Sequence, residues 1–99
     1  MKHQLRWTEQ AVEQLEAIAD YISLSSPVYA ESVVEKVFAR VQIALEYPES
    51  GIKVPEYDTP EIRQLIEWPY RIIYRHHQEA IEILAIVHGR RDLRDVELG

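Results

Sequence analysis

The chain has 99 residues, a length that suits one compact domain and leaves little room for a second. Its apolar fraction of 46% and charged fraction of 28% are ordinary for a folded protein, which excludes disorder of the whole chain. The absence of cysteine excludes disulfides, thiolate catalysis and cysteine-ligated zinc. No apolar stretch approaches the roughly 20 residues of a membrane span, and the first residues lack the apolar core of a signal peptide. We therefore expect a cytoplasmic protein that does not associate with membranes.

The charge is acidic overall and unevenly distributed. The formal net charge of −6 argues against a general nucleic-acid-binding protein, because affinity for phosphates comes mainly from Lys and Arg. Residues 1–60 hold five basic and ten acidic side chains, whereas residues 61–99 hold six and seven. All six basic residues of the second part are Arg, which favours planar recognition of carboxylate or phosphate groups. For any single Arg, a surface ion pair is an equally good explanation.

The first half of the chain predicts a strand followed by two helices. Leu5 and Trp7 alternate with polar residues, as in a short strand. Thr8 stands at the N-cap of a first helix, whose apolar stripe is Ala11, Leu15, Ile18, Ala19 and Ile22. Ser26 and Pro27 fit the start of a second helix that ends at Tyr47-Pro48, with the stripe Ala30, Val33, Val34, Val37, Val41, Ala44 and Leu45. Because neither helix can bury its stripe alone, we expect an antiparallel helical hairpin.

The second half predicts a small sheet. Residues 49–60 are interpreted as irregular connecting chain. Three segments rich in β-branched and aromatic residues then predict strands over Ile62–Ile66, Tyr70–His76 and Ile81–His88. Turns are expected at Trp68-Pro69 and at Gln78-Glu79. The expected fold is therefore α+β: a single compact β-α-α-β-β-β domain over residues 1–99, with the two-helix hairpin packed on one face of a mainly antiparallel sheet.

The last two strands predict which side chains share a face. A two-residue turn at Gln78-Glu79 pairs Arg75 with Glu82, and directly opposed residues lie on the same face. On that face the turn also pairs Ile73 with Leu84 and Arg71 with Ile86. The opposite face then carries three apolar or aromatic pairs, which we expect to lie under the helices: Tyr74 with Ile83, Ile72 with Ala85, and Tyr70 with Val87.

The first of these faces is the candidate binding surface. It carries Arg71, Arg75 and His88 around an apolar floor made by Ile73, Leu84 and Ile86. No sequence remains to cover this floor, so we expect it to be exposed. An exposed apolar floor with Arg at its rim is typical of a binding surface, and a homodimer interface is the alternative.

The same strands carry a family signature. Tyr70–Arg75 (YRIIYR), followed by Ile81–Val87 and His88-Gly89-Arg90-Arg91-Asp92-Leu93, resembles the C-terminal signature of the RelE/ParE toxins of type II toxin–antitoxin systems. Pro27-x-x-Ala30 and Leu45-x-x-Pro48-x-x-Gly51 match earlier landmarks of that family. The resemblance spans nearly the whole chain and implies the β-α-α-β-β-β fold deduced above.

The resemblance also implies a partner. In this family a cognate antitoxin wraps the toxin with its C-terminal segment and covers the functional face, in a toxin–antitoxin hetero-oligomer. An acidic, amphipathic antitoxin tail would complement both the arginines and the apolar floor, by folding as it binds. No cofactor and no metal are implied. The pair His76-His77 beside Glu79 is interpreted as a solvated turn, and Trp7 and Trp68 as core and turn packing.

Family members differ in target: RelE-like toxins cut mRNA on the ribosome, whereas ParE-like toxins poison DNA gyrase. For a ribonuclease, the resemblance assigns Arg71 and Arg91 as cationic groups, and His88 is the remaining acid–base candidate. Arg63 stands near the basic residues of the second strand of the ribonucleases. The ribonucleases generally place Tyr or His where this chain has Glu97, and several carry Lys on that strand, whereas none follows Lys53 here.

The ending His88–Asp92 is similar to the ParE form, and an acidic net charge fits poorly with ribosomal RNA. We therefore expect a gyrase-poisoning toxin that is not an enzyme. Its candidate contacts with target or antitoxin are the groups singled out above: Arg63, Arg71, Ile73, Arg75, Leu84, Ile86, His88, Arg90 and Arg91. The alternatives are a metal-independent, ribosome-dependent mRNA endoribonuclease and a non-toxic antitoxin-binding or dimeric interaction module.

Overall fold

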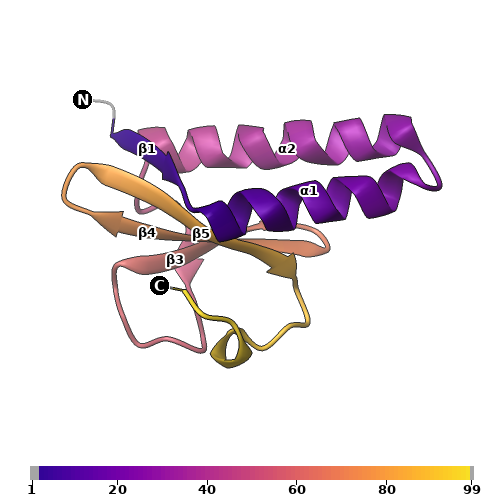
Figure 1. Ribbon diagram of the computed structural model, residues 1–99. Coiled ribbons are helices and arrows are strands. Elements are labelled where there is room, and N and C mark those ends of the chain that lie inside the picture. The colour runs from indigo at the N-terminus through magenta and orange to yellow at the C-terminus, as the bar shows by residue number, and fades with distance from the viewer. Residues whose placement is uncertain (1–2, 99) are drawn as a thin grey trace.

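Two antiparallel helices cover one face of a five-stranded sheet in the computed structural model, which describes residues 3–98 (Figure 1). In chain order the elements are β1 (Gln4–Trp7), α1 (Glu9–Ser23), α2 (Pro27–Glu46), β2 (Ile52–Lys53), β3 (Ile62–Glu67), β4 (Tyr70–His77), β5 (Ala80–His88) and the 3₁₀ turn η1 (Leu93–Asp95). The strand order is β1-β5-β4-β3-β2, with β1 parallel to β5 and the other pairs antiparallel. This arrangement confirms the predicted α+β fold and adds β2 and η1, which the sequence analysis did not predict.

Local sequence explains where the helices begin. The Thr8 hydroxyl oxygen accepts a hydrogen bond from the Ala11 amide at 3.1 Å, and Ser26 accepts one from Tyr29 at 3.1 Å. Both N-caps are therefore as predicted. The Thr8 hydroxyl also donates to the Ile83 carbonyl at 2.9 Å, which fastens the start of α1 to β5. In the described part of the chain, neither helix has the length and apolar character needed to cross a bilayer.

The sheet is buried on both faces, so the molecule has two hydrophobic cores. The first lies between helices and sheet and includes Ala11, Leu15, Val33, Val37, Val41, Ala44, Leu65, Ile72, Tyr74, Ile81, Ile83 and Ile86. The second lies on the opposite face and consists of Val54, Ile62, Ile73, Leu84, Ala85, Val87, Leu93, Val96 and Leu98. Its cover comes from the C-terminal segment and the loop before β3, which Figure 1 shows on the side of the sheet away from the helices.

A β-bulge changes the predicted register of the last hairpin. Near the turn the pairs Arg75 with Glu82 and Tyr74 with Ile83 are as predicted. Beyond them the register shifts by one residue between Ile73 and Tyr74, because β5 carries one extra residue opposite this point. The remaining predicted pairs are therefore wrong, and the observed ones are Ile73 with Ala85, Ile72 with Ile86, Arg71 with Val87, and Tyr70 with His88.

The bulge and the C-terminal segment also overturn the predicted open floor. Ile73, Leu84 and Ile86 are 0%, 1% and 1% exposed. Ile86 belongs to the core under the helices, since the extra residue in β5 reverses the alternation beyond it. Ile73 and Leu84 lie under Leu93 and its neighbours. The prediction failed because the segment after Asp92 was assigned no packing role, although its apolar residues are spaced to cover the sheet.

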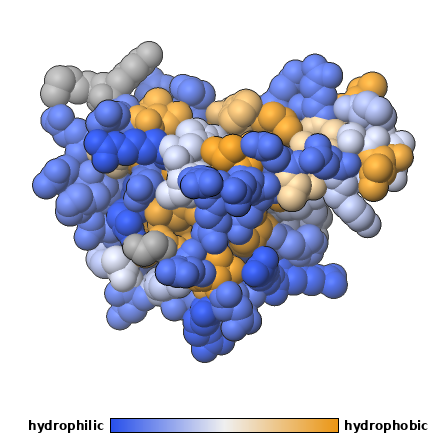
Figure 2. All heavy atoms as spheres, in the orientation of Figure 1, coloured by the Kyte–Doolittle hydropathy of each residue, from blue (hydrophilic) through white to orange (hydrophobic). Residues whose placement is uncertain are grey.

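Hydrophobic side chains nevertheless reach the surface in a few places. On the face drawn in Figure 2, hydrophilic residues dominate, and hydrophobic ones emerge along the helical layer, at the turn of the helical hairpin and in the lower part of the view below the helices. The most exposed of them at that turn are Tyr21, Leu24 and Val28. Trp68, in the turn between β3 and β4, is 75% exposed, so the prediction that it packs within the turn is wrong. Trp7 packs against the first core and contacts Phe38 edge to face, as expected of a core residue.

Candidate functional site

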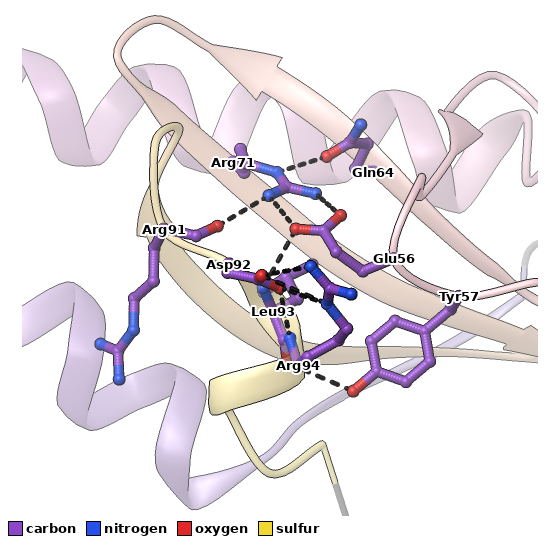
Figure 3. Close-up of polar contacts among 8 residues, drawn as sticks. All are labelled: Glu56, Tyr57, Gln64, Arg71, Arg91, Asp92, Leu93 and Arg94. Atoms are coloured by element: carbon purple, nitrogen blue, oxygen red, sulfur yellow. Dashed lines mark hydrogen bonds and ion pairs between the residues drawn. The ribbon is translucent and has the colours of Figure 1, made fainter.

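Arg71, on β4, is the centre of a buried polar cluster (Figure 3). Its side chain is only 8% exposed, and its guanidinium forms a two-pronged ion pair with Glu56, with both nitrogen-to-oxygen distances 2.8 Å. Its Nε–H donates to Gln64 at 2.6 Å, and one terminal nitrogen also donates to the Arg91 carbonyl at 3.0 Å. Four of the five N–H groups that an arginine carries are therefore satisfied within the protein.

The strands and one loop bring these partners together. Arg71 on β4 pairs with Ile66 on β3, and Gln64 lies two residues before Ile66, so Gln64 and Arg71 project from the same face. Glu56 comes from the loop between β2 and β3, which Val54 anchors because its side chain is 1% exposed in the second core. The sequence analysis missed Glu56. The sequence signal that could have revealed Glu56 was a carboxylate flanked by two apolar residues, within a segment that otherwise shows no regular pattern.

Glu56 also holds the C-terminal segment. Its carboxylate accepts a hydrogen bond from the Leu93 amide at 3.0 Å, and the neighbouring Tyr57 hydroxyl donates to the Leu93 carbonyl at 3.3 Å (Figure 3). The hydrogen bonds from Arg71 lower the pKa of Glu56 to about 2, against the opposing effect of burial. The ion pair is therefore fully charged at neutral pH, and it links β4, the loop before β3 and the segment after β5.

The exposed cations lie beside this cluster and not inside it. Arg91 supplies its carbonyl to Arg71, while its own guanidinium points away from Glu56 (Figure 3). Arg90 and Arg91 are both exposed, and neither forms an ion pair within residues 3–98. His88 is exposed too, but it pairs with Tyr70, which packs against the first core, so it lies on the helix side of the sheet and the prediction that it shares a face with Arg71 is wrong. Its ring accepts a hydrogen bond from the Arg90 amide at 3.2 Å and lies edge-on to Tyr70.

The other predicted arginines are elsewhere. Arg63 shares a face with Leu65, on the helix side of β3, and donates to the Gly51 carbonyl at 2.9 Å. Arg75 lies on the same face as Arg71 but four residues along β4, which is roughly 13 Å at strand spacing. It pairs with Glu82 at 3.2 Å. The structure therefore places Arg71 beside residues 89–91 and separates Arg63 and Arg75 from them.

A shallow hollow of about 350 Å³ opens beside the buried cluster. Its polar wall is Glu56, Gln64 and Arg71, and its floor and rim are Pro55, Ile66, Trp68, Pro69, Tyr70 and Gly89. The hollow is therefore mostly apolar, with an ion pair at one wall that is already closed on itself. This composition suits contact with another protein better than it suits phosphate binding, which needs cations that are free to pair.

The two adjacent histidines do not converge on a common point. The His76 ring lies edge-on to His3, whereas His77 contacts the Glu61 carboxylate. Over residues 3–98, no group of three His, Asp or Glu side chains is placed to hold a metal ion.

The comparisons with known proteins agree with one another. Residues 5–93 match the family model described as ParE toxin of type II toxin–antitoxin system, parDE. The chain is 33% identical over 90 residues to Y4kP, a candidate toxin of Sinorhizobium fredii, covering 91% of this chain and 92% of the relative. It is 33% identical over 89 residues to the toxin RelE2 of Caulobacter vibrioides, covering 89% and 97%.

Solved structures have the same fold. A chain of the chromosomal ParDE toxin–antitoxin system of P. aeruginosa superposes with a TM-score of 0.70 at 29% identity, covering 88% of this chain and 96% of that one. A chain of the RelBE2 toxin–antitoxin complex of Mycobacterium tuberculosis gives 0.60 at 20% identity, covering 89% and 99%. A mutant of E. coli RelE in the free state gives 0.63 at 17% identity, covering 91% and 86%. The last two similarities concern the fold alone.

Proposed function

Because this chain belongs to the ParE toxin family of type II toxin–antitoxin systems, we propose that it arrests growth by binding and poisoning DNA gyrase and that it is not a ribonuclease. The proposal concerns the target, since RelE-like and ParE-like toxins act on different cellular machines. It rests mainly on one observation, the internal neutralisation of Arg71 by Glu56.

Cleavage of RNA by 2′-hydroxyl attack needs an acid–base pair and cations that stabilise the charge developing on phosphorus. Arg71 occupies the position of the strand arginine in the ribonuclease members, yet its guanidinium faces Glu56 at 2.8 Å and is largely buried. A phosphate would have to displace a carboxylate from this pair. Residue 97, where the ribonucleases generally carry Tyr or His, is an exposed Glu. The first feature favours a structural role for Arg71, and the second leaves the last segment without the Tyr or His that the ribonucleases generally carry there.

Ribosome-dependent mRNA cleavage is the second candidate. The observation in its favour is that His88 and Arg91 are both exposed close to Gly89, which lines the hollow, and that Arg91 forms no ion pair within residues 3–98. An imidazole can transfer protons near neutral pH, and an arginine can bind a phosphate. If this candidate is right, cleavage must proceed without an arginine from β4 that is free to bind the phosphate.

An assay with purified components distinguishes the two candidate functions. Gyrase is incubated with supercoilable plasmid and increasing amounts of the protein, and both supercoiling and trapped covalent gyrase–DNA complexes are scored. The proposal predicts inhibition at near-stoichiometric protein, and loss of inhibition in Arg91→Ala, whose substituted side chain is exposed. An inert protein that is demonstrably folded, together with cleavage of ribosome-bound mRNA, would overturn the proposal in favour of the second candidate.

We also infer where the cognate antitoxin binds. The expected site on the sheet is occupied by the chain's own C-terminal segment. The helical layer instead has an open apolar groove of about 520 Å³, lined by Trp7, Val12, Leu15, Glu16, Ala19, Val34 and Phe38. Residues 7–35, which form most of this surface, contain six acidic side chains and neither Lys nor Arg. The groove therefore suits an amphipathic antitoxin helix with basic flanks, in place of the acidic tail expected from the sequence.

Substitution of a half-exposed groove residue tests this site. Phe38→Asp places a carboxylate in an apolar groove that is already acidic, so we expect antitoxin affinity to fall by at least about tenfold. Isothermal titration with the purified antitoxin measures the loss, and inhibition of gyrase should be unchanged. Unchanged antitoxin affinity in a folded Phe38→Asp variant would exclude the groove as the antitoxin site.

A further inference from the structure

We propose that Trp68 is the anchor through which this toxin engages its protein target, on a surface distinct from the antitoxin groove. The matching partner is a protein face with an apolar pocket for the indole, surrounded by carboxylates. The inference rests on the proposed function, because it takes the target to be a protein. It assigns a role to a side chain that neither core uses.

The exposure of Trp68 is unusual for so large an apolar side chain. The residue is 75% exposed, and Ile66, which lines the same hollow, is 41% exposed. Indole is among the side chains that lose the most apolar surface to water when they bind a partner. Exposed tryptophans beside a shallow hollow are therefore typical of binding anchors.

The turn presents Trp68 on a fixed support. The Gly89 amide donates to the Pro69 carbonyl at 2.7 Å, so the turn is joined to the end of β5. On its other side Glu67 pairs with Arg40 of α2 at 3.2 Å. A turn that is already held in place loses little backbone entropy when its side chain is buried at an interface, which increases the net gain from burying it.

The charges around Trp68 define the partner. The nearby carboxylates of Glu56 and Glu67 are paired with Arg71 and Arg40. Arg90 and Arg91 directly follow Gly89, which lines the hollow, and both are exposed and form no ion pair among the described residues. This end of an otherwise acidic molecule therefore offers two uncompensated positive charges beside an apolar anchor.

Two cations are enough to orient an acidic protein surface, but they are few for binding nucleic acid. Affinity for nucleic acids grows with the number of phosphates neutralised, and the whole chain carries a net charge of −6. Charge complementarity therefore favours a partner with acidic residues around an apolar site. Stacking of an RNA base on Trp68 is the competing use of the same side chain.

The test compares Trp68→Ala with Tyr47→Ala. Tyr47 is a matched control because it is 64% exposed and lies at the C-terminal end of α2, outside the residues that line the hollow. Gyrase supercoiling is titrated with wild type, both alanine variants and Trp68→Phe. Antitoxin affinity is measured in parallel, and circular dichroism establishes that each variant is folded.

We expect Trp68→Ala to need at least about 30-fold more protein for half inhibition, with Trp68→Phe intermediate and Tyr47→Ala unchanged. Antitoxin affinity should not change in any of the three. Full inhibition by Trp68→Ala overturns the inference while leaving the gyrase proposal in place. A Trp68→Ala variant that loses only antitoxin affinity has the same consequence. A third outcome is that the wild type spares gyrase but cuts mRNA, and that Trp68→Ala cuts mRNA less well. Both proposals then fail, and Trp68 contacts RNA.

Discussion

At the scale of single residues, the ion pair between Arg71 and Glu56 decides how the site is understood. The sequence singled out Arg71 as a candidate binding or catalytic residue, but its partner lies 15 residues earlier in an irregular loop, and nothing local links the two. A buried ion pair stabilises little by itself, yet removing one partner leaves an uncompensated charge. We therefore expect Arg71 to serve mainly as a structural cation in this chain.

Removing Glu56 should destabilise the fold strongly. Glu56→Ala leaves the Arg71 guanidinium buried and unpaired and frees the Leu93 amide, so we expect a loss of about 3–5 kcal/mol in the free energy of unfolding. Urea denaturation measures it. Asp58→Asn, which breaks the exposed pair with Lys53, is the control and should cost less than about 1 kcal/mol. Similar losses for both variants would contradict the structural role of the buried pair.

The same carboxylate should make stability depend on pH. The pKa of Glu56 is lowered from 4.5 to about 2, so its contribution is fully present above about pH 4.5. It is lost as the pH falls toward 2, because the unfolded chain then takes up a proton that the folded chain resists. The free energy of unfolding, measured at pH 6, 4, 3 and 2, should therefore fall less in Glu56→Gln than in wild type as the pH decreases. Parallel curves would contradict the assignment.

At the scale of elements, local sequence determined the helices better than the sheet. Thr8, Ser26 and Pro27 carry their capping roles within a few neighbouring residues, so both helix starts were predictable. The bulge in β5 was not predictable from local sequence. Leu84 and Ala85 both turn to the second core only because Leu93 and Val96 pack on them there. The two-residue strand β2 was equally hidden, since its position depends on a contact with Tyr74.

That contact gives a prediction at Gly51. The Gly51 amide donates to the Tyr74 hydroxyl at 3.0 Å, and the buried hydroxyl donates to the Pro48 carbonyl at 2.7 Å. A Cβ at residue 51 would lie 2.5 Å from that hydroxyl oxygen and 2.8 Å from the Gln64 carbonyl oxygen. Gly51→Ala should therefore cost about 1–3 kcal/mol through overpacking, seen as a lower melting temperature. Gly89→Ala, whose Cβ would lie 3.1 Å from the Pro69 carbonyl oxygen, should cost less. An equal or smaller loss for Gly51→Ala would contradict this packing.

At the scale of the whole molecule, the second core changes the functional interpretation. The residue pattern correctly placed a partly apolar, arginine-bearing face opposite the helices, but the chain covers that face itself. Open, mostly apolar hollows lie instead in the helical layer and at the end of the molecule around Trp68. On the proposed function, this separation would let antitoxin and target bind at different places on one small domain.

The second core should also be needed for stability. Leu93 is fully buried and lies above Ile73 and Leu84, so Leu93→Ala should reduce the free energy of unfolding by about 2–5 kcal/mol. Leu24→Ala, at the exposed hairpin turn, is the control and should change it by less than about 0.5 kcal/mol. Chemical denaturation of both variants provides the comparison. A small loss for Leu93→Ala would mean that the C-terminal segment does not form a core.

The central claim is that this toxin acts on gyrase through its surface, with Arg71 serving only the fold. The most direct measurement is inhibition of gyrase supercoiling by a variant that replaces the buried pair with apolar residues, Glu56→Leu with Arg71→Met. Replacing both partners avoids an unpaired charge, so the variant should fold. The account predicts inhibition within a few-fold of wild type. A folded double variant that no longer inhibits gyrase, where wild type does, would contradict it and return Arg71 to the functional site.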